Sequence, residues 1–341
     1  MKFIPYSLRD SGRKETMNNK KVVVSVPGKI NLMGEHAIVH GKPAILVAVN
    51  MRMKVTVEKA KSINSKVKSE DISEIKTTEN TDYVKYIVGI VKRHFKLKKL
   101  PPVKIVIESE VPAGYHLGSS ACVAVGVSAA LSYYLKKIWN PQLFNQLGFE
   151  AEKHMHGNPS GGDNTAVTIG GFIWFRKELD FLSSVWQLNI RLSESLNHFY
   201  LVDTGKPEET TGDMIKMVGL KVRNQNSKMR ILFDENEAQT KRVAMAIKRK
   251  DEKVLIDALK IGGKTLEDMG VVSDFVLPFI RKVEKSGGAA KILGGGGKKK
   301  GTGYLLVYHN DFQKVRKIAK YYDFSIKKLS LGAEGVRLEK K

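Results

Sequence analysis

Residues 114–121 read Gly114-Tyr115-His116-Leu117-Gly118-Ser119-Ser120-Ala121. This loop follows an alternating, strand-like run at 103–109 and precedes a small, apolar run at 121–131. Such a loop is typical of an anion site, because glycines let the backbone approach closely and the N–H groups and dipole of a helix start favour negative charge. No Gly-Lys-Ser/Thr ends the loop, so it is not a P-loop. The loop becomes strong evidence for an anion site only together with three other segments that indicate the same chemistry.

The length and composition indicate a folded protein of about two domains. The chain has 341 residues, of which 42% are hydrophobic. Its net charge of +23 would suit nucleic acid, an anionic membrane surface or phosphorylated ligands. The basic residues are spread along the chain without zinc-finger spacing or interleaved aromatic residues, which favours solvated helix faces over a nucleic-acid surface. The excess charge still helps to recruit polyanions.

The sequence shows no targeting segment and little cysteine chemistry. Residues 1–20 are mostly polar, and the apolar run at 122–135 is too short for a membrane span. Cys122 is the only cysteine, which excludes intramolecular disulfides and thiolate metal clusters. A packed side chain is favoured over a nucleophile at this position. We therefore expect a soluble, cytoplasmic protein without a membrane partner.

Hydrophobic periodicity predicts a mixed order of strands and helices. In the first half we expect a polar loop at 62–82, helices at 83–95, 119–136 and 142–156, and strands at 22–26, 45–57, 103–109 and 172–175. In the second half we expect helices at 208–219, 224–249, 252–269, 273–286 and 311–321, and strands at 199–202, 289–293, 303–308, 323–329 and 335–338. This order indicates an α+β fold with two domains and not a doubly wound parallel sheet.

The domain boundaries follow from the same pattern. We place an N-terminal arm at 1–20, a first domain at 21–185 and a second domain at 186–341. The first strand is expected to end at Pro27-Gly28, and the junction between the domains lies in the stretch 177–195.

The segment 27–41 gathers polar groups in a glycine-punctuated turn region after a strand. Lys29, Glu35 and His36 lie within eight residues of one another. A solvated loop with a surface lysine is one explanation. Three glycines and two imidazoles share the same connection, however, so a small-molecule site is equally favoured.

Two further segments offer groups for phosphoryl transfer. In the loop 114–121, backbone N–H groups suit triphosphate oxygens and a serine hydroxyl suits Mg2+, although a tight turn capped by serine explains the same residues. Glu152 precedes the turn His156-Gly157-Asn158-Pro159-Ser160-Gly161-Gly162-Asp163-Asn164, which would point Asp163 inward from a constrained loop. One carboxylate can neutralise charge through the metal while the other orients or deprotonates the nucleophile. A His-x-His pair at 154 and 156 does not match a zinc site.

The fourth segment is the glycine run of the C-terminal half. It reads Gly287-Gly288-Ala289-Ala290-Lys291-Ile292-Leu293-Gly294-Gly295-Gly296-Gly297-Lys298-Lys299-Lys300-Gly301. A flexible hairpin is the simple explanation of four consecutive glycines. The three lysines that follow them favour contact with an anion.

Together these four segments resemble the GHMP kinase superfamily, and within it the mevalonate kinases. The segment 27–41 is similar to the first motif, 112–121 to the phosphate loop Pro-x-Gly-x-Gly-Leu-Gly-Ser-Ser-Ala, 156–164 to the motif His-Gly-x-Pro-Ser-Gly-x-Asp-Asn, and 288–297 to the C-terminal glycine motif. The resemblance runs from about residue 21 to the C-terminus. All four motifs in order make it specific.

The resemblance implies a GHMP kinase fold, in which an N-terminal domain like domain 2 of ribosomal protein S5 precedes a ferredoxin-like C-terminal domain. The active site would lie in the cleft between them. It also implies that ATP and Mg2+ are used to transfer the γ-phosphoryl group to the 5-hydroxyl of mevalonate or a related hydroxy acid. Asp163 would be the catalytic base, Lys29 would stabilise charge on the transferring group, and Ser120 and Glu152 would hold the metal.

The remaining site residues come from the same matches. The resemblance implies ATP contacts from Gly114, His116, Leu117, Gly118, Ser119, Ser120 and Ala121. It implies substrate contacts from Lys29, Glu35, His36, Asp163, Thr204, Gly295 and Gly296. A homodimer is the assembly that we consider, and we expect no nucleic-acid partner.

The sequence departs from the family pattern at two places. His116 stands where the phosphate loop commonly has glycine, so a ring there would reshape the nucleotide contacts or add a titratable donor. The C-terminal motif has Leu293 where threonine is usual, and Lys298-Lys299-Lys300 would accommodate a second phosphate.

These departures leave several alternatives open. A phosphomevalonate kinase or another GHMP metabolite kinase is the main rival to a mevalonate kinase. A related decarboxylase is less favoured, because Lys29, Glu35-His36 and Glu152 together fit a kinase site. A non-catalytic nucleic-acid-binding relative is less favoured, because the chain retains the quartet of Lys29, Ser120, Glu152 and Asp163.

Overall fold

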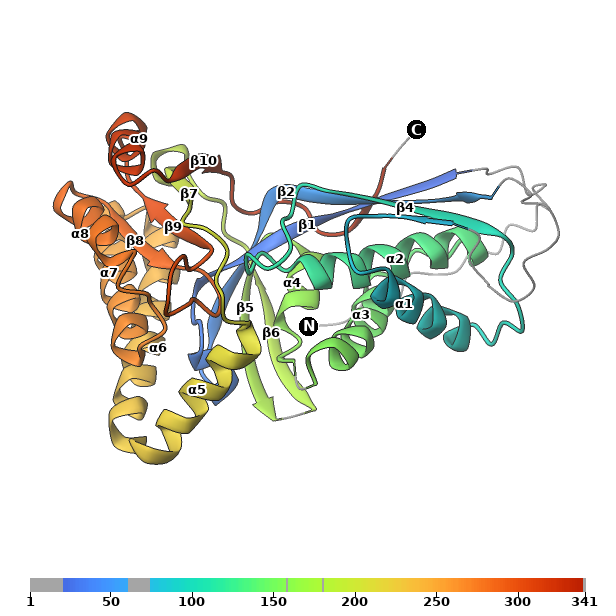
Figure 1. Ribbon diagram of the computed structural model, residues 1–341, viewed down its shortest axis with the longest axis horizontal. Coiled ribbons are helices and arrows are strands. Elements are labelled where there is room, and N and C mark those ends of the chain that lie inside the picture. Colours follow the sequence, from blue (N-terminus) through green and yellow to red (C-terminus); the bar gives the residue numbers. More distant parts are fainter. Residues whose placement is uncertain (1–20, 61–73, 158, 180, 340–341) are drawn as a thin grey trace.

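The computed structural model describes residues 21–60, 74–157, 159–179 and 181–339. The proposed arm at 1–20 lies outside these residues. The described chain forms two β-sheets at opposite ends of its long axis, each with its own helices (Figure 1).

The first sheet is built on two long strands, β1 (Lys21–Met33) and β2 (Ala44–Lys59), which pair antiparallel. Its strand order is β11-β1-β2-β4-β3, and the first residues of β2 also pair with β5, which pairs in turn with β6. The other strands are β3 (Glu74–Lys76), β4 (Val103–Ser109), β5 (Phe172–Leu179), β6 (Leu182–Leu188) and β11 (Arg337–Leu338). Only β3 and β4 run parallel among the pairs of the described chain. The valine-rich segments of β1 and β2 suit strands that are buried over most of their length.

Strand β1 does not end at Pro27-Gly28, so the boundary expected there is wrong. The register against β2 shifts between Pro27 and Lys29 and again between Asn31 and Met33. Such irregularities absorb a residue that cannot join the ladder and let the strand continue. The continued strand carries Lys29 and Asn31 toward the second sheet.

Four helices lie on one side of the first sheet (Figure 1). They are α1 (Thr81–His94), α2 (Ser119–Lys136), α3 (Pro141–His156) and α4 (Gly162–Ile169). Helices α2 and α4 pack directly against the strands of the sheet, and α1 and α3 pack against α2. Helix α2 is rich in alanine, valine and serine and is buried over most of its length, which lets it lie between the sheet and its neighbours. Helix α4 was not predicted, because its short run of glycine, asparagine and threonine has a low helix propensity.

The second sheet has the strand order β10-β7-β9-β8, with antiparallel neighbours throughout. Its strands are β7 (Phe199–Asp203), β8 (Ala289–Ile292), β9 (Tyr304–Tyr308) and β10 (Ser325–Leu329). Its helices are α5 (Thr211–Asn224), α6 (Asn226–Arg249), α7 (Glu252–Met269), α8 (Leu277–Lys285) and α9 (Phe312–Tyr321). Two 3-10 turns, Ala37–His40 and Glu194–Leu196, complete the described elements. Across the described ranges, none of the helices combines the length and apolar composition needed to cross a membrane.

The α+β fold class expected from the sequence is confirmed. The second sheet has the order and antiparallel pairing of a ferredoxin-like unit, and the first sheet carries its helices on one face. The division of the chain into 21–185 and 186–341 remains a proposal. Its boundary falls inside β6, and the last strand, β11, returns to pair with β1 in the first sheet.

One hydrophobic cluster of the described chain spans both halves. Buried residues of the first sheet, such as Val24 and Ile45, belong to the same cluster as Val243 of α6 and Leu255 of α7. Helix α6 also contacts β1 and β2 directly. The apolar junction therefore fixes the first sheet against the second half.

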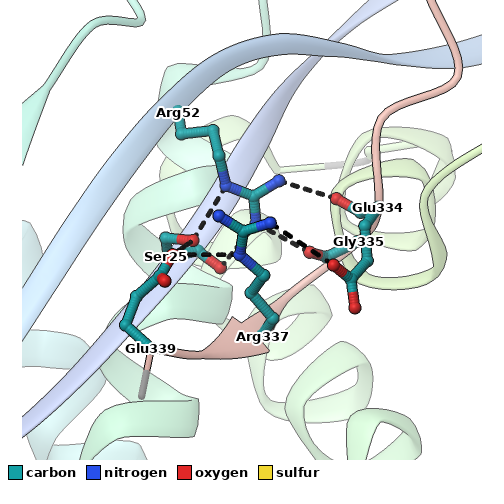
Figure 2. Close-up of polar contacts among 6 residues, drawn as sticks. All are labelled: Ser25, Arg52, Glu334, Gly335, Arg337 and Glu339. Atoms are coloured by element: carbon teal, nitrogen blue, oxygen red, sulfur yellow. Dashed lines mark hydrogen bonds and ion pairs between the residues drawn. The ribbon is translucent and has the colours of Figure 1, made fainter. Parts of the chain in front are cut away.

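The chain end is fastened to the first sheet through Arg52 of β2. Figure 2 shows its guanidinium between Ser25 and the segment that leads to β11. Arg52 Nε donates to Ser25 Oγ at 2.8 Å, and the two terminal nitrogens donate to the carbonyls of Glu334 and Gly335, each at 2.8 Å. Because a guanidinium offers several donors in one rigid plane, one side chain can satisfy carbonyls from separate segments.

We predict that Arg52→Lys lowers the free energy of unfolding by about 2 kcal/mol, because an ammonium keeps the charge but cannot reproduce the planar set of donors. Urea unfolding followed by circular dichroism measures this change. Arg249→Lys, at an exposed arginine near the end of α6, is the control and should leave the stability nearly unchanged. Equal stability of the Arg52→Lys variant and the wild type would contradict the role assigned to this contact.

Candidate active site

The loop 114–121 ends at the start of α2 in a form suited to an anion. Gly118 precedes the helix with φ of 76°, a left-handed conformation that glycine adopts without strain. No side chain caps this helix start, so its first N–H groups are available to a ligand. The Leu117 carbonyl accepts a hydrogen bond from the Lys29 N–H at 2.9 Å, which holds the loop beside β1.

The serines at the start of α2 each contact a carboxylate. Ser119 Oγ donates to Glu79 Oε2 at 3.1 Å, and Ser120 Oγ donates to Glu152 Oε2 at 3.1 Å. Glu152 is buried near the end of α3, and its other oxygen accepts a hydrogen bond from the Tyr83 hydroxyl at 2.7 Å. Burial raises the pKa of Glu152, whereas the bond from Tyr83 lowers it.

The oxygen donors of Glu152 and Ser120 fit the chemistry of Mg2+. In the described part of the chain, no group of three or more His, Cys, Asp and Glu side chains is arranged to hold a metal alone. Mg2+ is commonly held by one or two carboxylates together with waters and phosphate oxygens. One carboxylate and one hydroxyl beside a helix start provide the protein's share of such a site.

Lys29 and Asp163 form an ion pair next to this loop. Lys29 Nζ lies 2.8 Å from Asp163 Oδ1, and the exposed fractions of the two side chains are 4% and 42%. The ammonium is thus buried while the carboxylate remains open to a ligand. Asp163 lies in the first turn of α4 and not in a loop as expected, because Gly161 adopts a left-handed conformation from which the helix begins.

Asn31 connects this ion pair to the second sheet. Its side-chain oxygen accepts a hydrogen bond from Lys29 Nζ at 3.0 Å, and its backbone carbonyl accepts one from Lys291 Nζ at 3.2 Å. Lys291, on β8, also donates to its neighbour's carbonyl at Ile292 and forms an ion pair with Glu35. Both side chains of that pair are almost completely buried.

The structure places Glu35 and His36 inside the junction between the halves, and the substrate contacts expected of them remain a prediction. Glu35 is occupied by Lys291, and His36 Nε2 donates to the Gly295 carbonyl at 3.1 Å. Burial raises the pKa of Glu35 and lowers that of His36 to about 4. Glu35 Oε2 and His36 Nδ1 are buried without a hydrogen-bond partner in the described part of the chain.

His116 lies between the loop 114–121 and the second half. Its φ is 61°, which is rare for a residue other than glycine. Its Nδ1 is 3.1 Å from Thr211 Oγ1, and a Cβ on Gly294 would lie only 2.4 Å from the His116 Cβ. The missing side chain of Gly294 therefore makes room for the ring. Burial and the nearby Lys29 ammonium lower the pKa of His116 to about 4, so the ring is neutral at pH 7.

The glycine loop of the second half faces the phosphate loop through these contacts. Gly295 accepts the bond from His36, and the N–H of Gly297 donates to the Val271 carbonyl, which places Gly296 against that residue. Thr204 makes its hydrogen bond within the second half, and the substrate contact expected of it remains a prediction. Its buried hydroxyl donates to the Gly303 carbonyl at 2.8 Å and so serves the second sheet.

Lysines of the second half differ in whether they contact this loop. Lys206 packs against Gly114 so closely that a Cβ there would be 2.7 Å from the Lys206 Cε. Lys299 and Lys300 are exposed and pair with Glu208 at 3.3 and 3.8 Å. Their charge is thus partly neutralised within the second half.

The sequence motifs contain most of the residues predicted for the site but not all of the residues that surround it in the structure. Asn31 lies in the segment 27–41 and Lys291 in the segment 287–301, so the motifs themselves indicate that both residues are near the site. Tyr83, Lys206 and Thr211 lie outside every motif, and only the folded chain brings them to the loop.

Comparison with known proteins adds an independent result. Residues 82–171 match the model for the GHMP kinases N terminal domain. The chain is 30% identical over 284 residues to a mevalonate kinase of Archaeoglobus fulgidus, a match that covers 81% of this chain and 89% of the relative. A mevalonate kinase of Pyrococcus furiosus is 34% identical over 174 residues, which cover 46% of this chain and 52% of that relative.

Solved structures show the same fold. A mevalonate kinase of L. major in complex with R-mevalonate has a TM-score of 0.71 and 21% identity, and the match covers 87% of this chain and 90% of that one. A Streptococcus pneumoniae phosphomevalonate kinase in complex with phosphomevalonate and AMPPNP has a TM-score of 0.70 and 16% identity, covering 91% of this chain and 99% of that one. With the motifs, the helix-start loop and the match to the A. fulgidus enzyme over 81% of this chain in agreement, the chain belongs to the mevalonate kinase family of the GHMP kinase superfamily and is a phosphotransferase that acts on a hydroxyl group.

Proposed function

We propose that this protein is an ATP-dependent mevalonate kinase that transfers the γ-phosphoryl group to the 5-hydroxyl of mevalonate. The observation that carries the proposal is the Lys29–Asp163 ion pair beside the uncapped start of α2. It places an open carboxylate and a buried ammonium next to a loop that suits phosphate. The resemblance to the A. fulgidus enzyme supports mevalonate as the acceptor.

Asp163 and Lys29 divide the work at the reacting oxygen. The Asp163 carboxylate is open enough to accept a hydrogen bond from the acceptor hydroxyl and to take its proton as the new bond to phosphorus forms. Lys29 cannot turn away easily, because Asn31 holds its ammonium from the other side at 3.0 Å. The ammonium orients the carboxylate and offers positive charge to the transferring phosphoryl group.

The phosphates would be held by backbone and cations together. The N–H groups at the start of α2 suit phosphate oxygens, and Lys206 supplies a charge from the second half. Glu152 and Ser120 would hold Mg2+, which would neutralise charge on the phosphates. His116 would add a neutral ring whose Nε2 has no partner among the described residues.

Phosphomevalonate is the rival acceptor. The lysines at 298–300 were expected to accommodate a second phosphate, but Lys299 and Lys300 already pair with Glu208. A phosphomevalonate kinase is nevertheless among the proteins of the same fold. A direct comparison of turnover with mevalonate and with phosphomevalonate decides between the two acceptors.

We predict that ATP consumption is fastest with mevalonate in a screen that also includes phosphomevalonate, homoserine and galactose. In the Asp163→Asn variant the turnover number with mevalonate should fall by about a thousandfold, because the amide keeps the shape of the side chain but cannot take a proton. A coupled assay for ADP measures both effects.

Asp234→Asn is the matched control, because Asp234 also pairs with a lysine, Lys42, but lies far along the chain on α6. Its turnover should remain within twofold of the wild type. Consumption of ATP with none of the four acceptors would refute the proposed activity. A higher kcat/KM for phosphomevalonate than for mevalonate would show that phosphomevalonate is the acceptor.

We predict that His116→Gly changes the dependence of stability on pH. The pKa of His116 is about 4 in the folded chain and near 6.5 when unfolded, so the unfolded chain binds the proton more strongly in this window. Stability contributed by the neutral ring is present above pH 6.5 and is lost as the pH falls toward 4. From pH 7 to 5 the wild type should lose about 2 kcal/mol relative to His116→Gly.

Urea unfolding at the two pH values measures this difference. His116→Asn serves as the control for backbone strain, because asparagine also tolerates a positive φ and likewise removes the titrating group. Both variants should show the same shift with pH. A stability difference that stays constant between pH 7 and 5 would show that the ring is not buried in its neutral form.

A further inference from the structure

The start of α1 lies against the proposed metal site although no motif includes it. The Asn80 side chain accepts hydrogen bonds from the N–H groups of Asp82 and Tyr83, at 2.9 and 3.1 Å, and so fixes the first turn of the helix. The preceding residue, Glu79, accepts a hydrogen bond from Ser119 at 3.1 Å. A capped helix start is thus anchored to the first residue of α2.

Tyr83 extends from this turn to the carboxylate of Glu152. Its hydroxyl donates to Glu152 Oε1 at 2.7 Å, and only 5% of Tyr83 and 3% of Glu152 are exposed. A short hydrogen bond to a carboxylate is among the stronger ones, and burial keeps water from competing for it. One oxygen of Glu152 is therefore held by Tyr83.

The other oxygen of Glu152 has a different environment. Oε2 accepts the bond from Ser120, and His156 Nε2 lies 3.6 Å from it on the more exposed side. The two oxygens are therefore divided, with Oε1 directed to the interior and Oε2 directed to the helix start. A glutamate without such a partner could rotate about its three side-chain bonds, and this freedom would be lost each time a ligand bound.

We propose that Tyr83 is the positioning residue of the metal site, holding Glu152 so that Oε2 is presented beside Ser120 to a divalent cation. This inference rests on the proposed function, since the cation is the one that would accompany ATP. Tyr83 acts through Glu152 and does not touch the phosphates. Groups that orient a metal ligand in this way commonly change metal affinity by about 10- to 100-fold when they are removed.

Tyr83→Phe tests the inference because it deletes one oxygen and keeps the ring in the core. The measurement is the dissociation constant of Mn2+ in the complex with the full chain and saturating AMPPNP, followed by the electron paramagnetic resonance signal of free Mn2+. We expect Tyr83→Phe to weaken Mn2+ binding by about tenfold or more. Affinity for AMPPNP without metal should stay within twofold of the wild type.

Tyr86→Phe is the matched control, since Tyr86 lies on the same helix but stacks on His154 at 3.7 Å between ring centroids. It should bind Mn2+ as the wild type does. A second comparison uses Glu152→Gln, in which the amide keeps the side-chain shape but loses the charge. If Tyr83 acts only through Glu152, then adding Tyr83→Phe to Glu152→Gln should weaken Mn2+ binding no further.

Unchanged Mn2+ affinity in Tyr83→Phe would overturn the positioning role, and so would additive losses in the double variant. Absence of any Mn2+ binding to the wild-type complex beyond that of AMPPNP alone would overturn the proposed metal site together with this inference. The two failures are thus distinguishable by the behaviour of the wild type.

Discussion

Two buried lysines meet at Asn31, and the placement of the two halves depends on this contact. Lys29 donates to the Asn31 side chain and pairs with Asp163, while Lys291 arrives from the second sheet, donates to the Asn31 carbonyl and pairs with Glu35. A buried charge without a partner costs several kcal/mol. Lys291 finds its partner only when β8 lies against the end of β1. This requirement aligns the glycine loop of the second half with the phosphate loop of the first.

The site around this contact is built largely from helix starts. Serines begin α2, Asp163 lies in the first turn of α4, and Tyr83 lies in the first turn of α1. The positive end of a helix stabilises nearby carboxylates and would stabilise phosphate oxygens in the same way. Rigid elements therefore hold the acidic groups that phosphoryl transfer requires, although those groups repel one another. His116 adds a ring at a position where the backbone is strained, and it joins the loop to Thr211.

The sequence was most informative where pattern and turn residues agreed. The strand at 103–109 and the helix at 119–136 were predicted with the bounds observed, because alternation and a small apolar run are bordered by glycine and proline. Helix α4 was missed because tertiary packing overrides its poor propensity. The first motif also placed Glu35 near the site but did not predict that its side chain pairs with Lys291. The spacing of residues in a motif shows which backbone segments are close, and it does not show the partner of a buried side chain. The contact from Tyr83 depends on packing between helices and carries no local signal.

The central claim is that the Lys291–Glu35 pair joins the two halves, and a double-mutant cycle tests it most directly. Urea unfolding at pH 7 would compare Lys291→Met, Glu35→Gln and the double variant with the wild type. Each single variant leaves the other member of the buried pair without its charged partner, so its free energy of unfolding should fall by about 3 to 5 kcal/mol. The free energy of unfolding of the double variant should fall by clearly less than the sum of the two single losses. Losses that simply add would show that the two side chains act independently, and would contradict the account.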